Sequence, residues 1–165
     1  KAGEWLRARG GAKADRRADR EVKQGLVECY LHHNGKVGVL IEVNCETDFV
    51  ARTDDFRVLC RDLAMHVAST APIAVAAADV PAEIVERERR IYTEQVVQEG
   101  KPEAIRSKIV EGKLKKFFQE SVLLEQPFVK DDKQTVGELV KAVSSKTGEN
   151  VVVRRFVRFQ IGEAV

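Results

Sequence analysis

The chain has few of the features that identify a function at first sight. Aromatic residues make up only 6% of it, no apolar run reaches the roughly 18 to 20 residues that cross a bilayer, and no signal-peptide pattern opens it. Its three cysteines, Cys29, Cys45 and Cys60, form no C-x-x-C pair and have no histidine at metal-ligand spacing. We therefore expect no metal site, structural thiols in a reducing compartment, and a soluble cytoplasmic protein.

The chain also lacks an excess of charge of one sign. Its 28 lysines and arginines nearly balance 26 aspartates and glutamates, and the net charge of +2 gives no argument for wholesale binding to a polyanion. A protein or a small molecule is as good a partner on this ground as nucleic acid. With 165 residues, of which 44% are hydrophobic, the chain is long enough for one domain with a real core.

The pattern of apolar residues predicts a β-hairpin. Residues 26–33 and 36–44 flank Asn34-Gly35, a dipeptide suited to the positive φ angles of a type I′ turn. That turn sets His33 opposite Lys36 and fixes the register of the two strands. One face of the hairpin then carries Leu26, Tyr30, His32, Val37, Val39, Ile41 and Val43, and the other carries Val27, Cys29, Leu31 and Leu40.

The rest of the chain shows mostly helical spacing. Apolar residues three and four apart predict amphipathic helices joined by links that contain proline or glycine. Whether Gly112 interrupts one of these helices stays open. The predicted helices start at Thr53 or Asp54, run from Pro81 to about Gln98, start again at Pro102, and lie between Thr135 and Gly148.

Residues 151–161, VVVRRFVRFQI, predict a third strand with two apolar faces. We expect an α+β fold in which a three-stranded antiparallel sheet packs on helices on one face. The other face is then available for dimerisation, most simply with a second copy of the same sheet. Strict alternation places Val151, Val153, Val157, Phe159 and Ile161 on one side of this strand.

Two regions follow from the composition along the chain. Residues 1–24 are basic and poor in large apolar residues, which predicts the end of one helix, closed by Gly10-Gly11, and then a charged helical linker. Residues 25–165 are expected to form the core domain, which dimerises and binds a partner.

The stretch VNCETDFVAR places an acid and an aromatic, Asp48-Phe49, between a strand and a helix. Alternation from Val43 would turn Phe49 into the core, whereas a short connector on a rigid scaffold is a common place for recognition residues. The residues alone leave these two readings open. Pairing Cys45 with His32, His33 or His66 as a nucleophile lacks any local signature, and no phosphate-binding glycine loop is present, so we expect no enzyme and no bound nucleotide.

The stretch VNCETDFVAR closely resembles the signature of translation elongation factor Ts. Agreement with that family extends along most of the chain, through YLHHNGKVGVLIEVN, DLAMHVAS and TGENVVVRRFVRFQIGE in the same order. The chain is similar to the short form of the family, which has one core module. KAGEWLRARGGAKA resembles only the last helix of the family's ubiquitin-associated-like N-terminal domain, so most of that domain is expected to be missing.

The resemblance implies a guanine nucleotide exchange factor that acts as a homodimer. It implies binding to elongation factor Tu, both GDP-bound and nucleotide-free, and GDP release by disruption of Mg²⁺ and phosphate binding. The implied partner-binding residues are Thr47, Asp48, Phe49 and Val50, with Phe49 as a wedge between helices of the partner, and His32 or His33 in a second contact.

The resemblance implies no cofactor, no catalytic residue, no membrane contact and no nucleic acid. The alternative is an RNA-binding or ribosome-associated module that uses the basic N-terminal run with Arg154, Arg155 and Arg158. Two observations separate these functions. Exchange requires an exposed Phe49, whereas RNA binding requires a continuous basic face.

Overall fold

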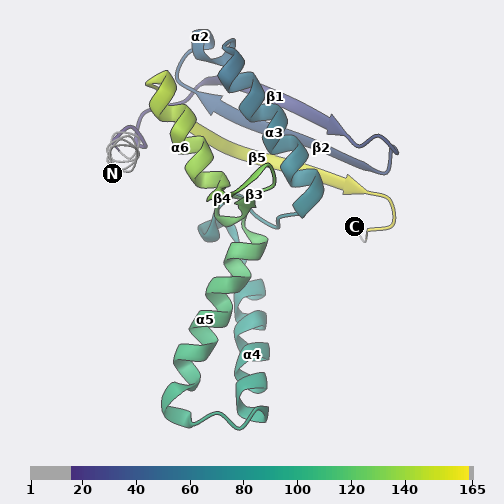
Figure 1. Ribbon diagram of the computed structural model, residues 1–165, viewed down its shortest axis with the longest axis vertical. Coiled ribbons are helices and arrows are strands. Elements are labelled where there is room, and N and C mark those ends of the chain that lie inside the picture. Colours follow the sequence, from purple (N-terminus) through teal and green to yellow (C-terminus); the bar gives the residue numbers. More distant parts are fainter. Residues whose placement is uncertain (1–15, 164–165) are drawn as a thin grey trace. The chain divides into compact units, whose positions relative to one another are not determined.

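The β-hairpin predicted around Asn34-Gly35 is present in the structure, a computed structural model that describes residues 16–163 (Figure 1). Its strands are β1 (Gln24–Leu31) and β2 (Val37–Cys45), and Leu31 pairs with Gly38, as the predicted register requires. The type I′ turn is wrong. Gly35 has a φ of 69°, but Asn34 does not share the positive φ that a type I′ turn requires. The side-chain oxygen of Asn34 instead accepts the N–H of Lys36 at 3.0 Å in an Asx-type turn.

The third strand, β5 (Val151–Gln160), pairs with β2 and completes a sheet of order β1-β2-β5. The predicted side assignment along β5 is wrong at its C-terminal half. Arg155 pairs with Glu42, but Val153 pairs with Val43, so Arg154 is an extra residue in the ladder. Such a bulge reverses the faces on either side of it. Val151 and Val153 are therefore buried, whereas Val157 and Phe159 lie on the opposite, exposed face.

Helices cover one face of the sheet, as predicted for the α+β class. Helix α3 (Asp54–Thr70) packs on β1 and β2, and α6 (Val136–Thr147) packs on β5 (Figure 1). Thr53 caps α3, and Thr135 and Gly148 bound α6, as the sequence indicated. The apolar stripe predicted on α3 is buried: Phe56, Leu59, Cys60, Leu63, Ala64 and Val67.

The opposite face of the sheet, which we call the outer face, bears exposed apolar side chains. These side chains come from all three strands, and together they form an apolar surface of the kind that binds another apolar surface. They are Val27, Leu31, Leu40, Val157 and Phe159.

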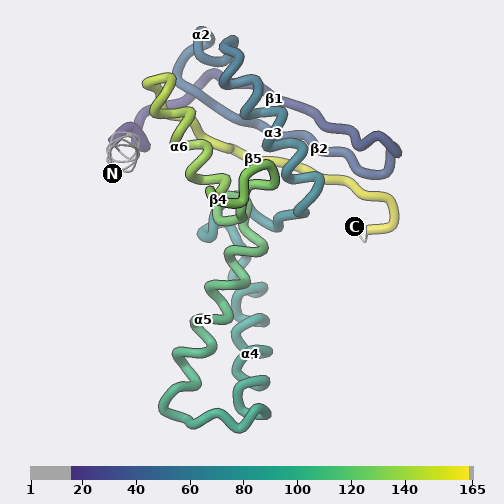
Figure 2. Tube along the Cα trace, viewed as in Figure 1, coloured from purple at the N-terminus to yellow at the C-terminus, as the bar shows by residue number. Residues whose placement is uncertain are grey.

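The chain divides into two compact units. The sheet unit takes in residues up to Ala71 and from Pro127 onward, and the helical unit spans Pro72–Gln126. In the helical unit, α4 (Ala82–Gln98) and α5 (Glu103–Ser121) fold back on each other (Figure 2). Helix α5 continues through Gly112, which answers the question that the sequence left open.

The helical unit has its own small core and a closed base. Val96 of α4 packs with Val110 and Leu114 of α5. At the base, residues on either side of the two helices run parallel, and Leu123 donates its N–H to the carbonyl oxygen of Ala74 at 2.9 Å. The short helices η1 (Ala77–Asp79) and η2 (Leu123–Glu125) complete this base.

Besides η1 and η2, three further short elements were not predicted. Strands β3 (Pro127–Phe128) and β4 (Asp131–Thr135) form a small sheet, and α2 (Asp48–Ala51) is a single helical turn. The buried ring of His66 on α3 stacks on Phe128, with ring centroids 5.9 Å apart.

Nowhere in residues 16–163 is there a helix long and apolar enough to span a membrane. The predicted helix before Gly10-Gly11 lies outside the described residues.

Candidate partner-binding site

The Asp48-Phe49 pair lies on α2, between the end of β2 and the start of α3. The Thr47 hydroxyl caps this single turn by accepting the N–H of Val50 at 3.3 Å. Two residues after α2, the Thr53 hydroxyl donates to the carbonyl oxygen of Val50 at 2.7 Å and caps α3. The strand-to-helix connection therefore consists of two consecutive capped helix starts and has little slack.

The phenyl ring of Phe49 is exposed, and 81% of the residue's surface is accessible. Its neighbour Val50 is 4% accessible and packs in the core together with Ala51. The period-two alternation fails because the backbone is extended at Thr47, with φ −127°, and helical from Asp48 onward. Helical steps then turn Val50 inward and Phe49 outward.

Asp48 is exposed beside the ring and is ion-paired with Arg52 one helical turn away. A surface pair of this kind contributes little to stability, and the carboxylate stays accessible to solvent or to a partner. The four predicted residues thus differ in setting. Asp48 and Phe49 are presented outward, Thr47 caps the turn, and Val50 holds it to the core.

Glu149, which the sequence did not single out, binds the base of this turn. One oxygen of its carboxylate accepts the backbone N–H groups of Glu46 and Thr47, each at 2.9 Å, and the other accepts the hydroxyl of Thr47. Glu149 follows Gly148, the left-handed residue that ends α6. No local pattern could have indicated this contact, because about a hundred residues separate the partners.

Glu46 and Asn150 join the same two segments, the end of β2 and the residues after α6, with the donor and acceptor roles exchanged. The carboxylate of Glu46 accepts the N–H of Asn150 at 2.6 Å, and the Asn150 side chain donates to the carbonyl oxygen of Arg20 at 2.9 Å. Each segment therefore binds the backbone of the other through a glutamate side chain. We call Glu46, Thr47, Glu149 and Asn150 the clasp.

Cys45 supports the turn as a protonated thiol. Its Sγ donates to the carbonyl oxygen of Thr47 at 3.2 Å. Burial, together with the negative charge of Glu149, raises the pKa of the Cys45 thiol to about 11. A nucleophile needs the opposite shift. His32 and His33, two of the histidines considered as partners, lie beyond the other end of β2, so the structure does not pair either of them with Cys45.

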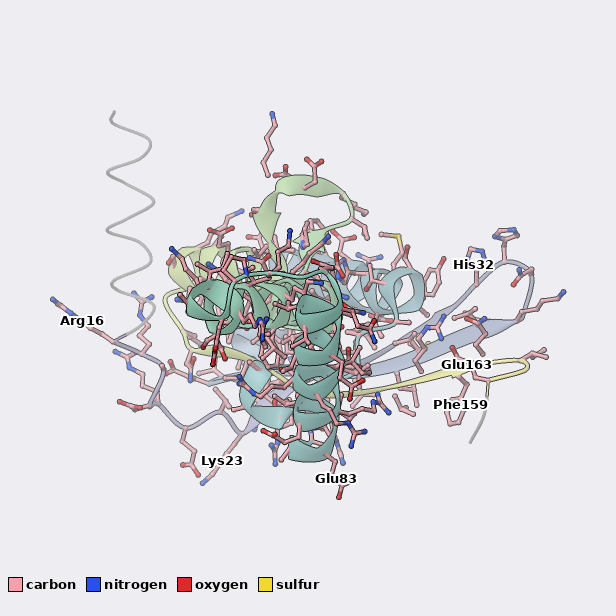
Figure 3. The ribbon with its side chains drawn as sticks, turned by 90° about the horizontal axis from the view of Figure 1, so that it is seen from below. Arg16, Lys23, His32, Glu83, Phe159 and Glu163 are labelled. Atoms are coloured by element: carbon pink, nitrogen blue, oxygen red, sulfur yellow. The ribbon has the colours of Figure 1, made fainter. Side chains whose placement is uncertain are left out.

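The second predicted contact, His32 and His33, lies at the tip of the β1–β2 hairpin. The Tyr30 hydroxyl is 2.9 Å from Nδ1 of His32, and the two histidine rings have centroids 4.2 Å apart. Figure 3 shows His32 near the end of the sheet that also carries Phe159 and Glu163. The nine residues of β2 separate this tip from the Phe49 turn, a length of about 30 Å at 3.3 Å per residue.

The three arginines of the RNA-binding alternative do not form one face. Arg155 is exposed and pairs with Glu42 at 2.7 Å. Arg158 points to the helix-covered side, where its side chain is 11% accessible and donates to the carbonyl oxygen of Ala68 at 3.2 Å. Arg155 and Arg158 are three residues apart in the regular part of β5, so ordinary alternation along the strand places them on opposite faces. Most of the basic N-terminal run lies outside the described residues.

Comparison with known proteins decides the family. The sequence profile described as "Elongation factor TS" matches residues 12–163. The chain belongs to the elongation factor Ts family. It is a translation elongation factor of protein biosynthesis, and the resemblance stated from its sequence is confirmed.

Individual members of the elongation factor Ts family resemble the chain along nearly its whole length. The elongation factor Ts of Rubrobacter xylanophilus is 55% identical over 156 residues, which cover 94% of this chain and 80% of that protein. Those of Moorella thermoacetica and Desulfosudis oleivorans are 52% and 50% identical, over 100% and 99% of this chain and 81% and 82% of their own lengths.

Proposed function

We propose that the chain is a non-enzymatic guanine nucleotide exchange factor for elongation factor Tu and acts in the cytoplasm. Phe49 is the observation that carries this proposal. The residue is 81% accessible on a turn whose backbone is hydrogen-bonded at both ends. A large aromatic ring held in solvent by a rigid connector suits insertion into a partner, because little conformational entropy is lost on binding.

Linkage between the two binding events provides the mechanism. Phe49 inserts between helices of the nucleotide-binding domain, and Asp48 and the turn backbone displace the groups that hold Mg²⁺ and the diphosphate. The chain then binds the nucleotide-free state more tightly than the GDP-bound state, and GDP affinity falls by the same factor. This chain itself binds neither the nucleotide nor a cofactor.

The energies require a broad interface. A thousandfold loss of GDP affinity corresponds to about 4 kcal/mol. Burial of one phenyl ring contributes about 1.5–3 kcal/mol, so Phe49 needs further contacts. His32 or His33 supplies one of them, and its distance of about 30 Å from the turn makes the interface extended.

The outer face is the proposed homodimer interface. It presents apolar side chains from three adjacent strands to solvent, and Phe159 is 70% accessible there. A second copy of the same face covers this surface by a two-fold arrangement without any further partner.

The release of labelled GDP from elongation factor Tu tests the exchange proposal. We expect release to be faster with the chain than without it, and the acceleration to depend on chain concentration until elongation factor Tu is saturated. An unchanged release rate at saturating chain would contradict the proposal. Binding of the chain to single-stranded RNA without such acceleration would favour the alternative function.

A further inference from the structure

We propose that Glu149 is a positioning residue for nucleotide exchange. It fixes the direction in which the Phe49 ring projects from α2, without contacting the partner itself. This inference rests on the proposed function and adds a residue to it. Glu149 lies outside the VNCETDFVAR stretch, after α6, and reaches the turn through its carboxylate alone.

The turn needs an external support. Helix α2 has four residues, and isolated helices are marginal below about 12–15 residues because nucleation is costly. Its direction therefore depends on contacts outside the turn. Val50 holds one side of it to the core, and Glu149 binds the residues at its start. Thr47 is the cap of α2, and both its N–H and its hydroxyl bind Glu149.

The bonds from Glu149 are of the strong kind. A carboxylate that accepts backbone N–H groups forms charge-assisted hydrogen bonds, roughly twice as strong as neutral ones. The cap itself depends on them, because the hydroxyl hydrogen of Thr47 points to Glu149 and leaves a lone pair free for the N–H of Val50.

Glu149 is itself held by the rigid part of the sheet unit. Gly148 ends α6 with a φ of 76°, and the Ser144 hydroxyl donates to the carbonyl oxygen of Glu149 at 2.6 Å. Helix α6 packs on α3 and β5. Through the clasp, the packed helix α6 therefore fixes the position of the exposed turn α2.

A loss of the Glu149 side chain should leave the core intact but loosen the start of the turn, where Thr47 and Asp48 precede Phe49. The ring of Phe49 would then sample several directions, and fewer encounters with elongation factor Tu would place it between the partner's helices. We expect Glu149→Ala to lower the maximal rate of stimulated GDP release about tenfold, which corresponds to about 1.4 kcal/mol. The chain concentration at half-maximal rate should change less, because the rest of the interface is retained.

A double-mutant cycle with Phe49→Ala separates positioning from general stability. If Glu149 acts through the ring, Glu149→Ala should have almost no further effect in the Phe49→Ala background. Glu149→Gln, which keeps one carbonyl oxygen for the two N–H groups, should restore most of the rate. Equal effects of Glu149→Ala in both backgrounds would overturn the positioning role.

Glu138→Ala is the matched control. It removes another carboxylate that accepts a backbone N–H, that of Thr135 at 2.8 Å, at the opposite end of α6. We expect it to lower the melting temperature through loss of the capping box, with the maximal exchange rate unchanged. A matching fall in exchange rate for Glu138→Ala would show that the effect of Glu149→Ala comes from α6 stability.

Amide hydrogen exchange tests the clasp without elongation factor Tu. Glu149→Ala should speed exchange at the amides of Glu46, Thr47 and Val50 and leave the middle of α3 unchanged. Unchanged amide protection would overturn the positional role. If instead the unsubstituted chain fails to accelerate GDP release, the proposed exchange function fails, and with it the role of Glu149 in exchange, whatever the amides show.

Discussion

Phe49 and Phe56 are seven residues apart and have opposite settings. Phe49 is 81% accessible, and Phe56 on α3 is completely buried. We expect Phe49→Ala to slow stimulated GDP release strongly while changing the free energy of unfolding by less than about 0.5 kcal/mol. Phe56→Ala should cost about 3–5 kcal/mol through lost burial and a cavity.

Urea unfolding and labelled GDP release on the two variants give the comparison. The contrast between them is the test, because both remove the same phenyl group. A large fall in melting temperature for Phe49→Ala, with exchange intact, would show that the Phe49 ring belongs to the core. That outcome would remove the wedge from the proposed mechanism.

The buried thiols, Cys45 and Cys60, should be unreactive in the native protein. Burial is the largest cause that raises their pKa values, to about 11 and about 12, so they carry almost no thiolate at pH 8.5. In a Cys29→Ser background, iodoacetamide should label neither thiol in the native state and both in urea. Labelling of the native Cys29→Ser variant within minutes would contradict the burial of these thiols.

The raised pKa values of Cys45 and Cys60 also predict how the stability of the protein changes at alkaline pH. Unfolded thiols titrate near pH 8.5, so between about pH 9 and 11 the native state holds protons that the unfolded state has released. Stability contributed by Cys45 and Cys60 is therefore complete below this window and falls as pH rises through it. Chemical unfolding at pH 8 and pH 10 should show the decrease, and a higher stability at pH 10 would contradict it.

Sequence reasoning located Asp48 and Phe49 but could not orient them. Alternation along the strand predicted that Phe49 is buried, whereas its place on a short connector predicted that it is exposed. The one-turn helix capped by Thr47 decides between them, and it is too short to show a periodic pattern in the sequence. Glu149 was missed for a different reason. Its partners are distant in sequence, and only the folded chain brings α6 to the end of β2.

Two glycines in different elements should respond oppositely to alanine. Gly25 in β1 has a φ of 150°, and an added Cβ would lie 2.7 Å from the Cα of Asn44 on β2, so Gly25→Ala should destabilise the protein by about 1–3 kcal/mol. Gly112 lies within α5 with open space around it, so Gly112→Ala should stabilise by about 0.5–1 kcal/mol.

Thermal unfolding followed by circular dichroism distinguishes the two substitutions. The Gly112 variant serves as the control, because both changes add the same methyl group and differ only in backbone setting. A stabilised Gly25→Ala variant would mean that β1 can move away from β2 at that point. A destabilised Gly112→Ala variant would mean that α5 is not straight through Gly112.

The elements were predicted where local chemistry determines them. Thr53, Thr135 and Gly148 mark helix ends through caps, and the pairing of β1 with β2 follows from the short connection around Gly35. The bulge at Arg154 was not foreseen, because it is a mismatch between strands far apart in sequence. Strand β3 was missed because it is only two residues long, and β4 was missed because its sequence, DDKQT, is polar throughout and has no apolar alternation.

The assembled protein should be a homodimer through the outer face. We expect light scattering at micromolar concentration to give twice the 18.5 kDa chain mass. Phe159→Glu places a charge on the outer face and should give monomers with unchanged helix content, because burial of an unpaired charge is costly. A clean monomer for the unsubstituted chain would contradict the sheet-pairing proposal.

Val97→Glu is the control for this prediction, since it places the same charge at an exposed apolar position of α4. It should leave the dimer intact. Cys29 gives a second readout, because it is exposed on the outer face and a dimer would cover it. Alkylation of Cys29 should therefore be faster in Phe159→Glu, and an equal rate in both proteins would argue against dimerisation through this face.

The closed base of the helical unit has an evolutionary consequence. Residues 73–75 and 121–124 run side by side, so the chain leaves the unit next to where it enters. Matched insertions or deletions of whole turns in α4 and α5 would therefore leave this base unchanged. We expect the lengths of α4 and α5 to differ between relatives while the sequence of the base of the helical unit stays constrained. The helical unit would then evolve in length independently of the sheet unit.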